Sequence, residues 1–161
     1  FSLSPAILGL YLGAPSLGYI LGNGLSGRFS VAVGVNRMIL IGTLITASGM
    51  LLCIGMFLFT TPIPLSFFGC VCFMGVGNGM VLPNATSGMM SVRPQLAGSA
   101  SGIGGMIMTA GGALIATGTA TILIPGTGAL PMLFIMLTCT ILSSLTITYV
   151  IKRSKNLSFA N

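Results

Sequence analysis

The sequence predicts an all-α membrane protein, built as a polytopic bundle of transmembrane helices. Three observations lead to this prediction: a mean hydropathy of +1.08, a charged fraction of only 4%, and five apolar stretches of about 20 residues or more. Soluble domains carry about 25% charged residues, so six charges in 161 residues could not cover a water-facing surface. A disordered chain is excluded too, because disorder requires low hydrophobicity and high charge.

Each apolar stretch is long enough to cross the hydrocarbon core of a bilayer, which takes about 20 helical residues. The charges fall between these stretches, and the alternating pattern of barrel strands is missing. We therefore predict the spans at residues 5–26, 38–60, 65–91, 95–123 and 130–151, followed by a tail at 152–161.

The prolines agree with this division, because proline fits the first turn of a helix and disrupts its interior. Pro5, Pro94 and Pro131 open predicted spans. Pro15 and Pro83 lie inside the first and third spans. We expect kinks at these two positions, with the freed carbonyl groups turned toward protein or water.

All six positive charges fall on one side when the five spans are threaded in order. Lys and Arg in short loops stay on the cytoplasmic side. With Arg28 and Arg37 inside, the chain crosses twice before Arg93 and twice more before the basic tail. The opposite side holds only the uncharged segments 1–4, 61–64 and 124–128. We therefore predict a multi-pass protein with a cytoplasmic C-terminus, whose net charge of +6 reflects topology and contact with anionic lipids rather than nucleic-acid binding.

Small residues at four-residue spacing allow two helix backbones to approach closely. In the fourth span the spacing alternates between four and three residues, which places the small residues on one stripe. We interpret this stripe as a close-packing or sliding surface against a neighbouring helix, the alternative being generic small-residue content. We expect leucine at Gly102 or Gly105 to abolish folding or function. The stripe comprises Gly98, Gly102, Gly105, Thr109, Gly112, Ala116 and Thr119. The same spacing pairs Gly9 with Gly13, Gly18 with Gly22, and Gly75 with Gly79.

Two asparagines interrupt the apolar third span, on either side of Pro83. An asparagine in hydrocarbon needs partners, so it normally faces protein or a water-filled cavity. Asn78 and Asn84 are six residues apart and point to different faces of the helix. Each one lines a solute pathway or makes a structural hydrogen bond between helices. Tyr11 lines a cavity or lies at the outer membrane interface.

Catalytic and metal chemistry are not expected for these residues. The chain has no Asp, Glu or His, the groups that usually perform acid–base catalysis. Cys70 and Cys72 face apart on a helix, and no His or carboxylate completes a metal site with them. We therefore expect no enzyme, no metal and no other cofactor. Proton-driven carriers use buried carboxylates or His, so any proton-coupling group must lie outside this segment.

Two segments resemble a known carrier family. The run GNGMVLPNATSG from Gly77 to Gly88 and the run SVRPQLAGSASG from Ser91 to Gly102 closely resemble one stretch of Bcr/CflA-type drug efflux carriers. In those members of the major facilitator superfamily, this stretch joins the tenth and eleventh helices. The segment GNGLSGRF that ends at Phe29 is similar to the superfamily's loop signature between the eighth and ninth helices.

The resemblance implies that residues 1–161 are a C-terminal fragment, the last five helices of a twelve-helix major-facilitator fold. The intact protein would be a proton-driven antiporter of the bacterial inner membrane that exports amphipathic drugs by alternating access. Pro83 would shape the cavity wall. Gly27, which stands where the stronger signature has Asp, would keep a turn role with Arg28. Arg28, Arg37 and Arg93 would form the cytoplasmic loop and gate.

The partners implied are the lipid bilayer, the missing N-terminal helices of the same protein, a small-molecule substrate and protons. Two other functions stay open at this point. One is an uptake carrier for another small solute, and the other is a non-transporting membrane scaffold or subunit that binds partner helices through its glycine stripes.

Overall fold

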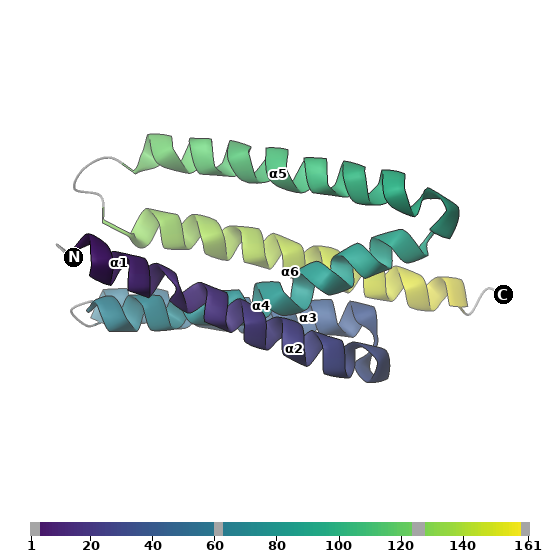
Figure 1. Cartoon of the computed structure of the whole chain (residues 1–161), viewed down its shortest axis with the longest axis horizontal. Helices are drawn as coiled ribbons and strands as arrows, with labels where there is room; N and C mark the ends of the chain where they lie inside the picture. The colour runs from purple at the N-terminus through teal and green to yellow at the C-terminus, as the bar shows by residue number, and fades with distance from the viewer. Residues whose placement is uncertain (1–3, 60–62, 124–127, 159–161) are drawn as a thin grey trace.

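The computed structural model describes residues 4–59, 63–123 and 128–158, and the regular structure in these ranges is entirely helical (Figure 1). This confirms the all-α class. Five helical segments are long and apolar enough to cross a membrane. They are Pro5–Val33, Val35–Phe59, Pro64–Ser91, Pro94–Ile122 and Leu130–Ser154. The predicted uncharged segments 1–4, 61–64 and 124–128, and the end of the predicted tail, lie partly outside the described residues.

The first span consists of two helices, α1 (Pro5–Leu12) and α2 (Ala14–Val33). The Ser4 side chain caps α1 by accepting a hydrogen bond from the backbone N–H of Ile7. The helix is interrupted at Gly13, and Pro15 occupies the first turn of α2. Pro15 therefore breaks the span at the expected place, because its ring is tolerated at a helix start and not inside one.

The corner after α2 differs from the prediction. We expected a loop between residues 26 and 38, but α2 continues to Val33 and α3 (Val35–Phe59) starts after a single residue. That residue, Gly34, has a φ of 93°, which a side chain would disfavour, and its N–H donates to the Ser30 carbonyl at 2.9 Å. Gly27 and Arg28 lie inside α2, so the predicted turn role for them is wrong. One glycine reverses the chain, and the helix satisfies the backbone groups before it.

Helix α4 (Pro64–Ser91) lies between α2 and α3 and packs against both. It stays helical through Pro83. A short 3₁₀ turn, η1 (Pro94–Leu96), leads into α5 (Ala97–Ile122), which has no buried residue and contacts mainly the neighbouring α4. The last helix, α6 (Leu130–Ser158), packs against α3 and extends seven residues past the predicted end of the fifth span at 151.

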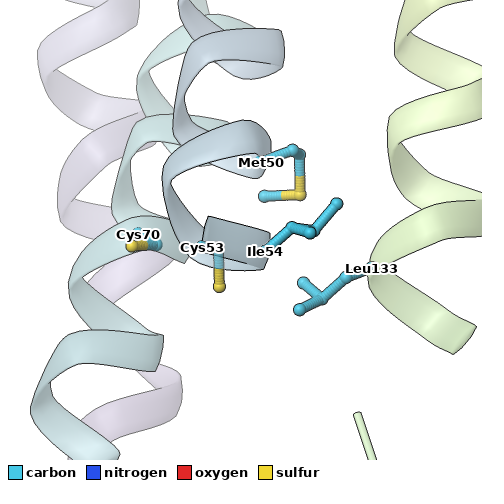
Figure 2. Packing of buried hydrophobic residues seen from close by; sticks show 5 residues of the cluster. All are labelled: Met50, Cys53, Ile54, Cys70 and Leu133. Carbon is cyan, nitrogen blue, oxygen red and sulfur yellow. The ribbon is translucent and has the colours of Figure 1, made fainter. Parts of the chain in front are cut away.

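One hydrophobic cluster joins α3, α4 and α6 (Figure 2). Met50, Cys53 and Ile54 of α3 meet Leu133 of α6, and Cys70 of α4 lies beside them. Met50 and Leu133 are completely buried. In a membrane such contacts stabilise by van der Waals packing, since lipid chains are as apolar as the side chains.

The cationic residues gather at one end of the bundle. The α2–α3 corner, the end of α4 and the end of α6 lie at the right in Figure 1. Every Lys and Arg belongs to these segments: Arg28, Arg37, Arg93, Lys152, Arg153 and Lys155. The 29 residues of α6 span about 43 Å at 1.5 Å per residue, more than the roughly 30 Å hydrocarbon core. Its basic last turns therefore extend beyond the apolar length of the bundle.

Candidate functional site

Backbone contact between glycines fixes α4 against α2. Gly18 and Gly22 of α2 face Gly75 and Gly79 of α4. A Cβ atom at Gly22 would collide with the carbonyl oxygen of Val76 and would lie 3.0 Å from the Gly79 Cα atom. These two predicted glycine pairs therefore do allow close approach, as small residues at this spacing do in membrane helices. The third pair does not: a Cβ atom at Gly9 would meet nothing within 4 Å.

Helix α4 makes a second close contact, with α3. A Cβ atom at Gly42 of α3 would lie 2.8 Å from the carbonyl oxygen of Gly77, and one at Gly77 would collide with the Thr46 hydroxyl. Asn78 follows Gly77 and therefore projects about 100° further around α4. The two glycine contacts thus determine which way Asn78 points.

Asn84 is buried in the α2–α4 interface, with only 3% of its surface exposed. Its side-chain amide donates to the hydroxyl oxygen of Ser26 and to the carbonyl oxygen of Met80, both at 2.7 Å. The single hydroxyl proton of Ser30 goes to the Ser26 carbonyl at 2.6 Å, so the Ser26 hydroxyl is the donor in the 3.1 Å Ser26–Ser30 contact. In this structure Asn84 therefore makes a structural hydrogen bond between helices, which is the second of the two roles expected for it.

Asn78 lies beside a cavity of about 340 Å³ between α3, α4, α5 and α6. An adjoining cavity of about 180 Å³ shares Thr46, Asn78, Cys139 and Thr140 with it. We call the two together the Asn78 cavity. The helix α5 residues on its wall are Gly112, Ile115, Ala116 and Thr119. Thr43 and Ser143 line the smaller part.

The Asn78 cavity lies near the middle of the helices. Asn78 is 14 residues after Pro64 and 13 before Ser91, the two ends of α4 (78 − 64 and 91 − 78). Thr46 is 11 residues from the start of α3 and 13 from its end (46 − 35 and 59 − 46). Helical carriers place their substrate sites near the bilayer midplane, and this cavity has the corresponding position along the helices.

The polar groups of the cavity can bind an uncharged partner. The hydroxyls of Thr43, Thr46 and Thr140 donate to the carbonyl oxygens of Leu40, Gly42 and Met136 at 2.9, 3.1 and 2.8 Å. Each hydroxyl oxygen keeps acceptor capacity toward the cavity.

The side chain of Asn78 is exposed, and no described residue is hydrogen-bonded to it. It offers two N–H donors and one carbonyl acceptor. Among the described lining residues only Cys139 carries a titratable group. The cavity therefore suits a neutral amide, carbonyl or hydroxyl group on an apolar molecule.

The glycines of the α5 stripe are not closely packed against any described helix. A Cβ atom at Gly98, Gly102, Gly105 or Gly112 would meet nothing within 4 Å. The expected close packing of this stripe is therefore not made by any described helix. Gly112 instead lines the Asn78 cavity. Helix α5 instead touches α4 through Gly104, where a Cβ atom would lie 2.7 Å from the sulfur of Met89. Met132, Ile135 and Met136 of α6 line the cavity together with Gly112.

The two remaining predicted pathway residues lie away from the Asn78 cavity. Tyr11 is stacked on Phe68 with ring centroids 4.9 Å apart and planes at 16°, and it ties α1 to α4. Pro83 lines a separate cavity of about 400 Å³, together with Tyr19 of α2 and Met108 of α5. The site therefore includes Asn78 and not Tyr11 or Pro83.

The three predicted gate arginines lie at the same end of the bundle and are all exposed. Arg28 is in α2 with its guanidinium 5.8 Å from the ring centroid of Phe29. Arg37 is in the first turn of α3 and lines a cleft between α3, α4 and α6. Arg93 lies between α4 and η1.

The sequence analysis missed Thr43, Thr46, Thr140 and Ser143. These residues form two hydroxyl pairs, each at three-residue spacing and near the middle of a span. That spacing puts both members of a pair on one helix face. The signal was weak because a hydroxyl can donate to its own helix and so tolerates a lipid-facing position.

Comparisons of this chain with protein-family models, with curated proteins and with solved structures return no match. No family membership follows from them.

Proposed function

We propose that this chain is the solute-binding part of a membrane carrier that moves small amphipathic molecules by alternating access. The observation that carries the proposal is the Asn78 cavity, a largely apolar space at mid-helix that holds an amide hydrogen-bonded to no described residue. Ligand sites are typically apolar cavities with a few polar groups that fix orientation. An asparagine placed at membrane depth without a structural partner fits a solute pathway.

The architecture is compatible with alternating access. One wall of the cavity comes from α3 and from α4 and α6, which both pack against α3, and the other comes from α5, which has no buried residue. Access to a midplane site changes when one group of helices moves against another. In this proposal α5 is the movable wall.

Direction, energy source and location complete the proposal. The resemblance to Bcr/CflA-type carriers supports drug export at the bacterial inner membrane, driven by protons, from a twelve-helix protein of which these are the last five. The end that carries all six cations would face the cytoplasm by the positive-inside rule. Because the 161 residues include no Asp, Glu or His, the proton-coupling groups would lie outside this segment.

Transport by reconstituted protein tests the proposal. The protein that contains this segment is placed in vesicles, and accumulation of a neutral, chloramphenicol-like amphipathic drug is followed under an imposed pH gradient. We expect accumulation that collapses with the gradient. Accumulation that persists unchanged would contradict proton coupling, and the absence of any drug movement would contradict the carrier.

Asn78→Ala and Asn23→Ala provide the matched pair for the binding residue. The amide of Asn78 faces the cavity, whereas that of Asn23 donates to its own helix at the Tyr19 carbonyl at 2.9 Å. We expect Asn78→Ala to lower drug transport or change its substrate range at unchanged protein level. Equal effects of the two substitutions would contradict a binding role for Asn78.

The exposed face of α5 favours one second candidate, a non-transporting subunit that binds partner helices through that face. The same vesicles separate the two functions. A subunit gives no drug flux, and its loss changes the assembly of another membrane protein instead.

A further inference from the structure

The cationic end of the bundle contains a cleft that is separate from the Asn78 cavity. It has a volume of about 790 Å³ and lies between the α2–α3 corner, the last turns of α4 and the last turns of α6. Gly34, Asn36 and Arg37 form one wall, and Ser91 and Ser154 lie on the others. None of the residues that line it belongs to the cavity proposed for solute binding.

The electrostatics of the cleft favour an anion. Arg37 lines it, and Arg93, Lys152 and Arg153 occupy the segments next to its walls. Residues 1–161 contain six cationic and no acidic side chains, so no carboxylate side chain among them neutralises these cations. A counter-charge must come from outside these residues.

The backbone adds to this field. Helix α3 begins at Val35, and its first turn borders the cleft. In α3, the first backbone N–H that donates a hydrogen bond to an earlier carbonyl is that of Met38, which donates to the Gly34 carbonyl at 3.0 Å. The N–H groups at the start of a helix carry partial positive charge and bind phosphate readily.

The rest of the cleft is apolar. Ile147, which is buried, lines it together with Val92, Val150 and Ile151. A lining that combines polar and cationic groups with apolar side chains matches a molecule with an anionic head and a hydrocarbon body. A soluble anion would use only half of this surface.

We propose that the cleft binds an anionic phospholipid from the bilayer. Its phosphate lies against Arg37 and the first turn of α3, its headgroup hydroxyls contact Asn36, Ser91 or Ser154, and an acyl chain follows the apolar surface of α4 and α6. Basic pockets between membrane helices recognise such headgroups. The proposal rests on the membrane location of the bundle and not on transport.

The lipid-binding proposal is tested with spin-labelled lipids and the protein in vesicles of phosphatidylcholine that contain a minor fraction of phosphatidylglycerol. The quantity measured is the association of labelled phosphatidylglycerol with the protein relative to labelled phosphatidylcholine. We expect a clear preference for phosphatidylglycerol. No preference would overturn the proposal. Displacement of the labelled lipid by inorganic phosphate would overturn it too, since it would reveal a small-anion site.

Two matched pairs locate the binding. Arg37→Gln should lower the preference for phosphatidylglycerol roughly fivefold, which is the contribution of one cation near a lipid surface. Arg28→Gln removes the same charge outside the cleft and should change this preference little. Equal losses would show diffuse attraction and contradict a site.

Gly88→Leu fills the cleft without changing charge, because a Cβ atom there meets only Val35, at 3.5 Å. It should also abolish the preference, while Gly24→Leu, at a glycine with nothing within 4 Å, should preserve it. Retention of the preference in well-folded Gly88→Leu protein would contradict the assignment.

Discussion

Helices α4 and α5 both carry glycines at four-residue spacing, but only the glycines of α4 meet the backbone of another helix. In α4, Gly79 lies against Gly22 of α2, and Gly75 meets the backbone of Pro15 and Tyr19. The glycines of the α5 stripe have no such counterpart among the described helices, since a Cβ atom at any of them would meet nothing within 4 Å. Small residues permit the close approach of two helix backbones, but whether the backbones meet also depends on the side chains of the partner helix.

This difference divides the molecule into two parts. The packed unit consists of α2, α3 and α4, which glycine contacts and the Asn84–Ser26 hydrogen bond hold together. The open side is α5, held by its connection to α4 and by the Gly104–Met89 contact. The Asn78 cavity forms between α3 and α4 of the packed unit, α5 of the open side and α6, so the packed unit presents the amide and the sparsely packed α5 faces it.

The largest expected difference is between an alanine in the packed unit and one on α5. Gly22→Ala puts a Cβ atom against the Val76 carbonyl and should lower the free energy of unfolding by about 3 kcal/mol, the upper range of overpacking. Gly102→Ala has open space and should be neutral or gain up to about 1 kcal/mol of helix stability. Denaturant titration in detergent, followed by circular dichroism, measures both.

This pair also separates the two interpretations of the α5 stripe. The spacing of its glycines predicts that substitution on α5 is severe, and the structure predicts that it is mild. A loss of stability in Gly102→Ala as large as in Gly22→Ala would show that α5 packs closely after all.

A smaller difference is expected at the α2–α3 corner. Gly34→Ala forces a side chain into a positive φ and should cost about 1–2 kcal/mol. Gly27→Ala lies in a regular turn of α2 with nothing within 4 Å of the new Cβ atom and should be stabilising or neutral. The same unfolding titration compares them. If Gly27→Ala were the more harmful substitution, the chain would turn at Gly27, as the sequence alone suggested.

The smallest stability effect is expected from the two asparagines. Asn84→Ala removes the interhelical hydrogen bond to Ser26, and such bonds contribute about 0.6 kcal/mol on average in membranes. Asn78→Ala removes no hydrogen bond to a described residue, so the free energy of unfolding should not change. Thermal stability in one detergent reports both variants. Equal destabilisation would place Asn78 in a structural contact as well.

Much of the fold follows from the sequence because hydrophobic length determines it. The five long apolar helices, the break at Pro15 and the close contact of two glycine pairs all have local causes. The corner at Gly34 was missed because four glycines lie between residues 22 and 34. Which of them adopts a positive φ depends on how α2 and α3 pack.

The site was predictable only in part. Asn78 was expected to line a pathway or make a structural bond, and Gly112 was expected only in helix packing. The role of Asn84 depends on Ser26, which lies 58 positions away in the sequence. The spacing within one helix cannot reveal such a partner. The hydroxyls of Thr46 and Thr140 join the site because α3 and α6 bring them to the same cavity as Asn78.

The native cysteines test, without any substitution, whether a solvent-accessible cavity lies beside Asn78 at mid-helix. Cys139 lines that cavity, whereas Cys53 and Cys70 are buried in the cluster of Figure 2. The measurement is labelling of membrane-embedded protein with a small, membrane-impermeant maleimide, read for each cysteine by mass spectrometry. We expect Cys139 to react while Cys53 and Cys70 stay unmodified. Labelling of Cys139 no faster than that of Cys53 would contradict it.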